Sequence, residues 1–272
     1  MATTGTVRGK TDGRGAGDIA RLIDDLRTHR SYVDRNPIFA RLASGDITRF
    51  HYLAYLRETY HLIKHTPKYL TIAADRVAES DPRLSAYFRN FAREETGHEL
   101  LCVRDIDALG ENPDAILSGD PNPGAWGIVM QCYFWAGHGN PVALLGDAFA
   151  TEELGVAQCI EAAKLLEANY DIPRRATNFL RVHGSADEGH LEAAARTIAW
   201  YAGDRAQYAD IVYGTKMTYR YYSQLFTDVL ELGDDWCTGA SGFSAQPSLS
   251  SRGRLGLAIA ATGLDFLVRV TL

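Results

Sequence analysis

Three short fragments of this 272-residue chain combine carboxylate and imidazole side chains. They are Glu94-Glu95-Thr96-Gly97-His98, Glu152-Glu153 and His183-Gly184-Ser185-Ala186-Asp187-Glu188-Gly189-His190. Hard carboxylate oxygens together with imidazole nitrogens suit iron or manganese that must activate dioxygen, and the chain offers no thiolate cluster beside them. The fragments therefore supply the ligand inventory of a paired-iron site.

The third fragment carries the most specific signal. His183, Asp187 and His190 are spaced i, i+4, i+7, which on a helix places the three side chains within about 60° of arc. A helix face so crowded with ionisable groups cannot pack against a core unless something compensates the charge. We interpret these three residues as metal ligands on one helix face.

The first two fragments leave alternatives open. Glu95 and His98 have the i, i+3 spacing of ligand pairs in helical-bundle metal sites, and such pairs are also common on helix surfaces. Glu94 is a rival to Glu95, and Glu58 with His61 repeats the same spacing earlier in the chain. Either member of the second fragment could face the interior.

The elements that must position these residues are helices. Apolar residues recur with helical periodicity from about Asp18 to Glu231, so the sequence predicts a single all-α domain. Three prolines stand where a first helical turn tolerates them, and Asp81 and Asn140 precede two of them as capping residues. These signals predict long helices that contain the three fragments. These helices are expected at Pro82 to Leu109, Pro141 to Tyr170 and Pro173 to Ala202.

The predicted domain covers residues 17–232. It lies between a Gly-rich, disordered N-terminal arm (1–16) and a C-terminal stretch (233–272) that combines a loop-like linker with an apolar tail. Asp265 and Arg269 interrupt this tail, so we expect it to dock or fray, with a membrane or partner contact as the alternative.

Composition narrows the class of ligand. The net charge is −6, with no dominant run of Lys or Arg, which argues against a nucleic-acid partner and favours a small-molecule substrate. The four cysteines form no C-x-x-C pair and are expected to be buried thiols.

Because the N-terminus also lacks the apolar stretch of a secretory signal, we expect a cytoplasmic protein without a membrane partner. A homodimer is a possible assembly.

With these residues in view, the chain resembles the haem-oxygenase-like diiron oxidases. The segment Asn36 to Gly45 resembles the opening segment of that family, and the stretch His98 to Gly110 has a sequence typical of it. The resemblance covers roughly residues 20–230. It implies a seven-helix haem-oxygenase-like bundle that binds two irons in place of haem.

The resemblance also implies a ligand set. Family members use a Glu and a His on one helix, a Glu on a middle helix and a His-x-x-x-Asp-x-x-His set on a later helix. In this sequence these map onto Glu95, His98, Glu152, His183, Asp187 and His190. Glu152 is preferred over Glu153 because the family tends to place this ligand three residues before a glycine, here Gly155.

The activity implied is oxidation of a small molecule by dioxygen at two Fe(II) ions, with an external reductant as a further possible requirement. An amino acid or amine is the leading substrate, through N-oxygenation or oxidative carbon–carbon cleavage in a biosynthetic pathway. Olefin formation and fatty-acid-like substrates belong to the same range. The alternatives are a metal-independent enzyme of the thiaminase or pyrroloquinoline-quinone-synthesis type, a ferritin-like iron-binding protein, and a non-catalytic helical module.

Overall fold

The computed structural model describes residues 16–239, without the side chains of residues 16–19 and 186–188. Almost all of the predicted N-terminal arm and the apolar C-terminal tail lie outside the described residues, and so does the side chain of Asp187. The described part is all-α and contains no strand, which confirms the predicted fold class. None of its helices is both long and apolar enough to cross a membrane.

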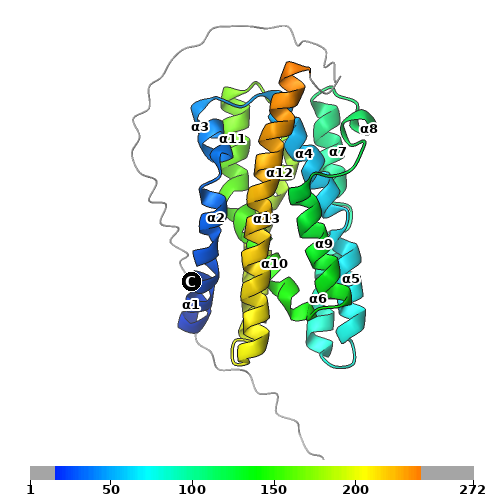
Figure 1. The fold of residues 1–272 in the computed structure, drawn as a ribbon, viewed down its shortest axis with the longest axis vertical. Coiled ribbons are helices and arrows are strands. Elements are labelled where there is room, and N and C mark those ends of the chain that lie inside the picture. The colour runs from blue at the N-terminus through cyan, green and yellow to red at the C-terminus, as the bar shows by residue number, and fades with distance from the viewer. Residues whose placement is uncertain (1–15, 240–272) are drawn as a thin grey trace, which may run out of the picture.

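The helices run mostly along the long axis of the molecule (Figure 1). The central helix is α13 (Arg205–Thr238), which packs against α4, α9 and α10. The remaining helices are α1 (Ala16–Arg27), α2 (Ser31–Asp34), α3 (Pro37–Ser44), α4 (Arg49–Ile63), α5 (Thr66–Val77), α6 (Pro82–Glu94), α7 (Glu99–Ala108), α8 (Pro113–Ile116), α9 (Pro123–Gly137), α10 (Leu144–Leu154), α11 (Ile160–Asn169) and α12 (Asn178–Ala199). Short 3-10 turns η1 (Thr28–Arg30), η2 (Pro141–Ala143) and η4 (Arg174–Ala176) and a π-helical turn, η3 (Gly155–Cys159), complete the path.

The predicted helix starts at Pro82 and Pro141 are confirmed. The Asp81 side chain accepts a hydrogen bond from the Leu84 amide at 3.0 Å, and Asn140 accepts one from the Val142 amide at 3.2 Å. These are the side-chain caps that the residues before each proline were expected to provide. The second start is a 3-10 turn that leads directly into α10.

The expected continuous helix from Pro82 to Leu109 is wrong. Helix α6 ends at Glu94 and α7 begins at Glu99, with Gly97 between them at a φ of +92°. Such a left-handed conformation is easily adopted only by glycine, and it turns the chain at this point. Glu95 and His98 therefore lie at a helix break and not one turn apart on a helix face.

The expected start of the third ligand helix at Pro173 is also wrong. Helix α12 begins at Asn178, where the carboxylate of Asp105 on α7 accepts hydrogen bonds from the Asn178 amide at 3.1 Å and the Phe179 amide at 2.8 Å. A carboxylate at a helix N-terminus satisfies free backbone donors and complements the helix dipole. Because this cap comes from a distant helix, no local sequence signal announces it.

The last helix extends past the expected domain end at Leu232. Helix α13 continues to Thr238, and Gly239 at φ +70° ends it. The stretch after Leu232 is helical despite its loop-like composition, because it packs closely against α4. Gly233 permits this contact, since a Cβ at this position would lie 2.6 Å from the His51 ring. Trp236 is buried in the same stretch.

The four cysteines are all free thiols. Cys102 and Cys132 are buried as expected, whereas Cys159 is half-buried and Cys237 is exposed. The expectation of four buried thiols is therefore wrong for Cys237, which lies on the last turn of α13.

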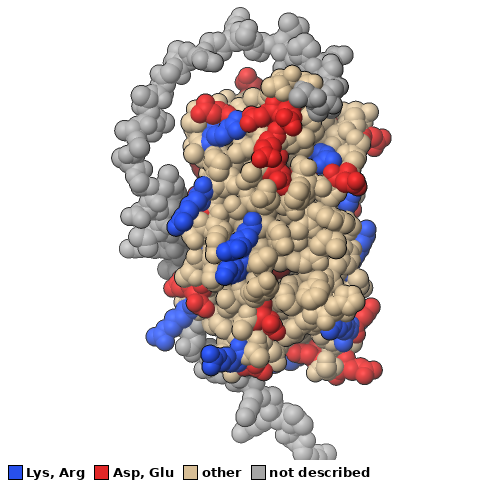
Figure 2. All heavy atoms as spheres, viewed as in Figure 1, with Lys and Arg blue, Asp and Glu red and all other residues tan. Residues whose placement is uncertain are grey.

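Charged side chains lie at both ends of the face shown in Figure 2, and Lys and Arg side chains also lie near its middle, over α13 (Figures 1 and 2). The area over α9 is mostly uncharged. Exposed large side chains of these two helices are Trp126, Met130, Phe134 and Tyr213. No broad basic area is visible on this face.

Candidate metal centre

Four segments bring carboxylates and imidazoles together inside the bundle. The break between α6 and α7 provides Glu95 and His98, α10 provides Glu152, and α12 provides His183 and His190. These residues form two groups, Glu95 with His98 and His183, and Glu95 with Glu152 and His190. Within each group the possible ligand atoms lie within 4.8 Å of one another. Glu95 belongs to both groups, so its carboxylate lies between two possible cation positions.

Several donor atoms are close enough to share one cation. Nδ1 of His98 lies 3.2 Å from Glu95 Oε2, and Nδ1 of His190 lies 3.3 Å from Glu152 Oε2 and 3.9 Å from Glu95 Oε1. The rings of His98 and His183 are nearly perpendicular, with centroids 5.0 Å apart. The predicted ligands whose side chains are described thus lie at one place.

The two Nδ1 atoms of His98 and His190 test whether a metal fits. Both are buried, and neither makes a hydrogen bond in the described structure, although carboxylate oxygens lie close by. A buried polar atom without a partner is costly, and native structures rarely contain one without a water or ion. A divalent cation would satisfy the imidazole nitrogens and compensate the carboxylates, so the donor set fits iron.

The backbone orients the third imidazole. His183 Nδ1 lies 2.9 Å from the Phe179 carbonyl oxygen, which can only accept, so Nδ1 carries the proton of the neutral ring. Nε2 is then the unprotonated nitrogen, as a metal ligand requires. In metal sites, the ring nitrogen of a ligand histidine that does not bind the metal commonly donates such a hydrogen bond, which fixes the tautomer and the orientation of the ring.

The electrostatics of the site favour positive charge. The carboxylate of Glu95 raises the pKa of His98, and that of Glu152 raises the pKa of His190. Burial instead lowers the pKa of His183. The carboxylates thus stabilise protons on two histidines in the metal-free protein, and a bound cation would displace those protons.

Glu152 and its neighbour Glu153 have different surroundings. The Glu153 carboxylate lies 2.7 Å from Arg30 Nη1 and 3.4 Å from Arg27 Nε, and it accepts a hydrogen bond from the Tyr219 hydroxyl at 3.1 Å. Glu153 is therefore already paired with cations, and as the next residue on α10 it points about 100° away from Glu152. This arrangement supports Glu152, and not Glu153, as the proposed ligand.

Glu94 lies at the edge of the site. Its side chain is 43% exposed, it accepts a hydrogen bond from Asn90 Nδ2 at 2.7 Å, and Oε2 lies 3.5 Å from His190 Nε2. Glu95 is buried and contacts histidines of both groups. The arrangement supports Glu95 as the inner ligand.

The other members of the sequence-predicted set have clear positions. Asp187 lies on α12 between His183 and His190, but its side chain is not described. Glu58 is fully buried away from the site, where it pairs with Arg57 and accepts a hydrogen bond from the Asn122 amide at 2.8 Å. Neither Glu58 nor His61 belongs to a metal-type group among the described residues.

A π-helical turn lies next to Glu152. The turn η3 follows α10 directly and packs against α12. Just after the turn, Ile160 at the start of α11 lies close to α12 because position 184 is a glycine: a Cβ there would lie 2.6 Å from the Ile160 side chain. Single π-helical turns inside α-helices occur frequently at functional sites. Here the turn inserts a residue just after the ligand position and changes which side chains of this segment face the interior.

A cavity of about 160 Å³ adjoins the metal-type groups. Glu95, Glu152 and His183 form part of its wall, and most of the remaining lining is aliphatic or aromatic. Tyr55 and Phe179 pack edge-on within this lining, with ring centroids 6.3 Å apart. A mostly apolar cavity with a few polar groups is the usual form of a small-molecule site.

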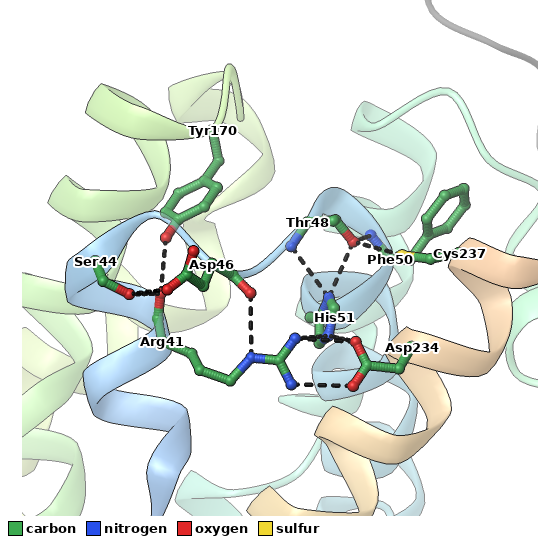
Figure 3. A network of polar contacts seen from close by, with 9 residues as sticks. All are labelled: Arg41, Ser44, Asp46, Thr48, Phe50, His51, Tyr170, Asp234 and Cys237. Carbon is green, nitrogen blue, oxygen red and sulfur yellow. Dashed lines mark hydrogen bonds and ion pairs between the residues drawn. The ribbon is translucent and has the colours of Figure 1, made fainter. Parts of the chain in front are cut away.

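Residues of α3 and of the start of α4 form part of the cavity wall, and polar contacts hold this part of the chain in place (Figure 3). Arg41 on α3 donates to both carboxylate oxygens of Asp234 on α13, at 2.9 and 3.0 Å. The Tyr170 hydroxyl donates to the Leu42 carbonyl at 2.6 Å. These bonds tie α3 to both neighbouring helices, so α3 forms a fixed wall of the cavity.

His51 belongs to both the cavity and this network (Figure 3). The Thr48 amide donates to its Nδ1 at 3.0 Å, so the proton of the neutral ring lies on Nε2, which donates to Asp234 Oδ1 at 3.0 Å. Burial lowers the pKa of His51. The ring is therefore held neutral, and it acts as a structural link between α4 and α13.

The sequence interpretation did not identify Asp147 as a site residue. It lies on α10, is 5% exposed and lines the cavity. The available signal was a single charged residue in the otherwise apolar stretch of residues 141–150. No comparable sequence signal marked the Phe179 carbonyl as the partner of His183, or Asp105 as the cap of α12. The cap depends on how α7 packs against α12.

Comparison with protein families identifies the group to which the chain belongs. A family model described as "Iron-containing redox enzyme" matches residues 53–223, a range that contains both metal-type groups. The chain belongs to this family. Comparison with curated proteins found no match.

Solved structures similar to this member of the iron-containing redox enzymes share its fold. A domain of unknown function with a heme oxygenase-like fold from Shewanella denitrificans is 22% identical, with a TM-score of 0.72 over 85% of this chain and 96% of that chain. A TenA homologue from Pseudomonas syringae is 12% identical, with a TM-score of 0.66 over 78% and 92% of the two chains. A TenA homologue from Pyrococcus furiosus is 13% identical, with a TM-score of 0.61 over 77% and 98%. The predicted haem-oxygenase-like fold is thereby confirmed.

Proposed function

We propose that this iron-containing redox enzyme is a non-haem diiron oxidase or oxygenase that uses dioxygen to oxidise a small molecule, with an amino acid or amine as the leading substrate. The observation that carries the proposal is the position of Glu95 in two adjacent groups of ligand-type atoms. A carboxylate shared in this way suits two metal ions better than one. The ligands proposed are Glu95, His98, Glu152, His183, Asp187 and His190.

Two Fe(II) ions at these positions would supply the electrons that dioxygen needs to become an oxidant. Around them, the chain contributes orientation and charge. Glu95 and Glu152 compensate cationic charge, and the Phe179 carbonyl holds the His183 ring with Nε2 unprotonated. The apolar cavity wall excludes water and binds the substrate beside the ligands.

The proposal predicts a defined reaction with dioxygen. Protein loaded anaerobically with Fe(II) and then mixed with dioxygen in a stopped-flow spectrometer should show a transient visible absorption band and consume dioxygen in proportion to the bound iron. The matched control is Glu95→Gln, which we expect to bind little iron and to show no band. If wild-type protein binds iron but shows neither a band nor dioxygen uptake above that of the variant, the oxidase proposal fails.

A metal-independent enzyme on the same fold is the second candidate, because TenA homologues share the helical arrangement. At 12% and 13% identity this similarity concerns the fold alone. The Nδ1 atoms of His98 and His190 make no hydrogen bond and lie 3.2 and 3.3 Å from the carboxylates of Glu95 and Glu152, an arrangement that favours a metal site. Absence of bound iron after anaerobic loading would favour the second candidate.

A further inference from the structure

The cavity wall contains no Lys or Arg among the described residues, although it contains carboxylates. Glu95 and Glu152 belong to the proposed metal centre, where cations would compensate them. Asp147 is the remaining carboxylate of the wall, and no ion pair to it occurs in the described part of the chain. The cavity thus has an acidic group that no cationic side chain of the described residues pairs with and that is not among the proposed metal ligands.

The two oxygens of Asp147 are unequally satisfied. Oδ1 accepts a good hydrogen bond from the Thr218 hydroxyl at 2.7 Å. Oδ2 lies 3.4 Å from the Tyr69 hydroxyl, which lies equally far from Thr66 Oγ1 and has a single proton to donate. The nearby Cys132 thiol is only a weak donor. Oδ2 therefore retains hydrogen-bonding capacity beside the cavity.

A buried carboxylate without a cation is costly, and burial raises the pKa of Asp147. A cation supplied by a ligand would offset that cost. Thr66 and Tyr69 line the cavity together with Asp147, so three oxygen acceptors lie close together in an otherwise mostly apolar wall. A primary ammonium group carries three donors and matches such a set, whereas a carboxylate would be repelled by Asp147.

We propose that Asp147, assisted by Thr66 and Tyr69, binds the primary ammonium group of a substrate whose remaining part is apolar. This inference rests on the proposed function, since it assigns the substrate class of the same cavity. Asp147 precedes Glu152 on α10 by five residues. An amine held there would extend its carbon chain along the apolar wall and past the carboxylates of the metal centre.

The test compares three ligands of equal chain length, hexylamine, 1-hexanol and hexanoate, by isothermal titration calorimetry at neutral pH. Metal-free protein and anaerobic Fe(II)-loaded protein are both titrated. In the metal-free protein, hexylamine should bind about tenfold or more tightly than 1-hexanol, the effect of one charge-assisted hydrogen bond. Hexanoate should bind most weakly to this form.

Asp147→Asn should remove the preference for the amine and leave the affinity for 1-hexanol within about twofold. The amide oxygen can still accept from Thr218, so the variant should fold, and circular dichroism and iron content check this. Thr66→Val is a second variant and should weaken amine binding alone. Asp228→Asn, a change at a buried carboxylate outside the cavity lining, is the matched control and should keep the preference.

Equal affinity of the metal-free wild-type protein for hexylamine and 1-hexanol would overturn the inference, as would an unchanged preference in Asp147→Asn. These outcomes are separate from the fate of the proposed function. Iron binding and dioxygen uptake without amine selectivity would refute only the role of Asp147. Amine selectivity in a protein that binds no iron would refute only the diiron proposal.

Discussion

At the residue scale, the most informative pair is Glu152 and Glu153, adjacent carboxylates that face different partners. Glu152 Oε2 lies 3.3 Å from Nδ1 of His190, whereas Glu153 pairs with Arg27 and Arg30. Both side chains are buried. We infer that one serves the metal centre and the other holds α1 and η1 against α10.

Substituting each of the two residues should therefore separate iron binding from stability. Glu153→Gln should destabilise metal-free protein by about 1–3 kcal/mol, because it removes the carboxylate partner of Arg27 and one of the two carboxylate partners of Arg30, and should keep most of the iron. Glu152→Gln should lose about half of the iron and should destabilise metal-free protein less than Glu153→Gln does, because it gives up an ion pair with an imidazole and not with two arginines. Urea unfolding and iron analysis after desalting measure the two effects. Equal iron loss in both variants would contradict these roles.

Most of the candidate metal ligands could be predicted from the sequence. The structural reason why Glu95 and His98 lie close together could not. Glu95, His98, Glu152, His183 and His190 stand out by type and spacing, and the structure places them together. The helical i, i+3 argument for Glu95 and His98 nevertheless fails, because Gly97 breaks the helix between them. Their proximity comes from the turn, which depends on the left-handed conformation of one glycine.

At the element scale, the position of α10 depends on close contact with α13. A Cβ on Gly146 would lie 2.1 Å from the Ile211 carbonyl oxygen, and one on Gly214 would lie 2.3 Å from the Ala143 carbonyl oxygen. The clashing atoms belong to the backbone, which cannot move aside cheaply. The two glycines thus set the depth at which α10 carries Asp147 and Glu152 into the bundle.

Gly146→Ala should separate these two helices. We expect a loss of about 2–3 kcal/mol in the free energy of unfolding, together with weaker iron binding, because α10 carries Glu152. Gly137→Ala on α9 is the control, since a Cβ there meets nothing within 4 Å. That change should be neutral or stabilise by up to about 1 kcal/mol. Similar losses in the two variants, measured by urea unfolding, would refute the close-contact argument.

The start or end of a helix could be predicted from the sequence where a neighbouring residue caps it. It could not be predicted where a residue of another helix determines it. Asp81 and Asn140 cap their own helices, as expected. The start of α12 depends on Asp105 from α7, and the end of α13 depends on the fit of Gly233 against His51. Periodicity and local caps say nothing about such contacts between distant segments.

At the scale of the whole molecule, buried neutral histidines link stability to pH. His61 is 3% exposed, and its Nδ1 accepts a hydrogen bond from Lys64 Nζ at 2.9 Å. Burial, followed by the charges of Lys64 and Arg57, lowers the pKa of His61 to about 4. In the unfolded chain the ordinary value of 6.5 applies. Between these two values the unfolded state binds more protons than the folded state.

The contribution of His61 to stability is therefore complete above about pH 6.5 and is lost as the pH falls toward 4. We expect this residue to account for a decrease of about 1–3 kcal/mol over that range. Wild type and His61→Gln should be unfolded with urea between pH 7 and pH 4.5, with the exposed His138→Gln as control. A smaller decrease in His61→Gln than in the other two proteins supports the argument, and three parallel curves would refute it.

The most direct test of the diiron centre is the iron content of four proteins after anaerobic loading with Fe(II) and desalting. The shared position of Glu95 predicts about two irons per chain in wild type and in Glu94→Gln, about one in Glu152→Gln, and fewer than one in Glu95→Gln. Circular dichroism should show that all four are folded. One iron or none in wild type, or two irons retained in Glu95→Gln, would contradict the account.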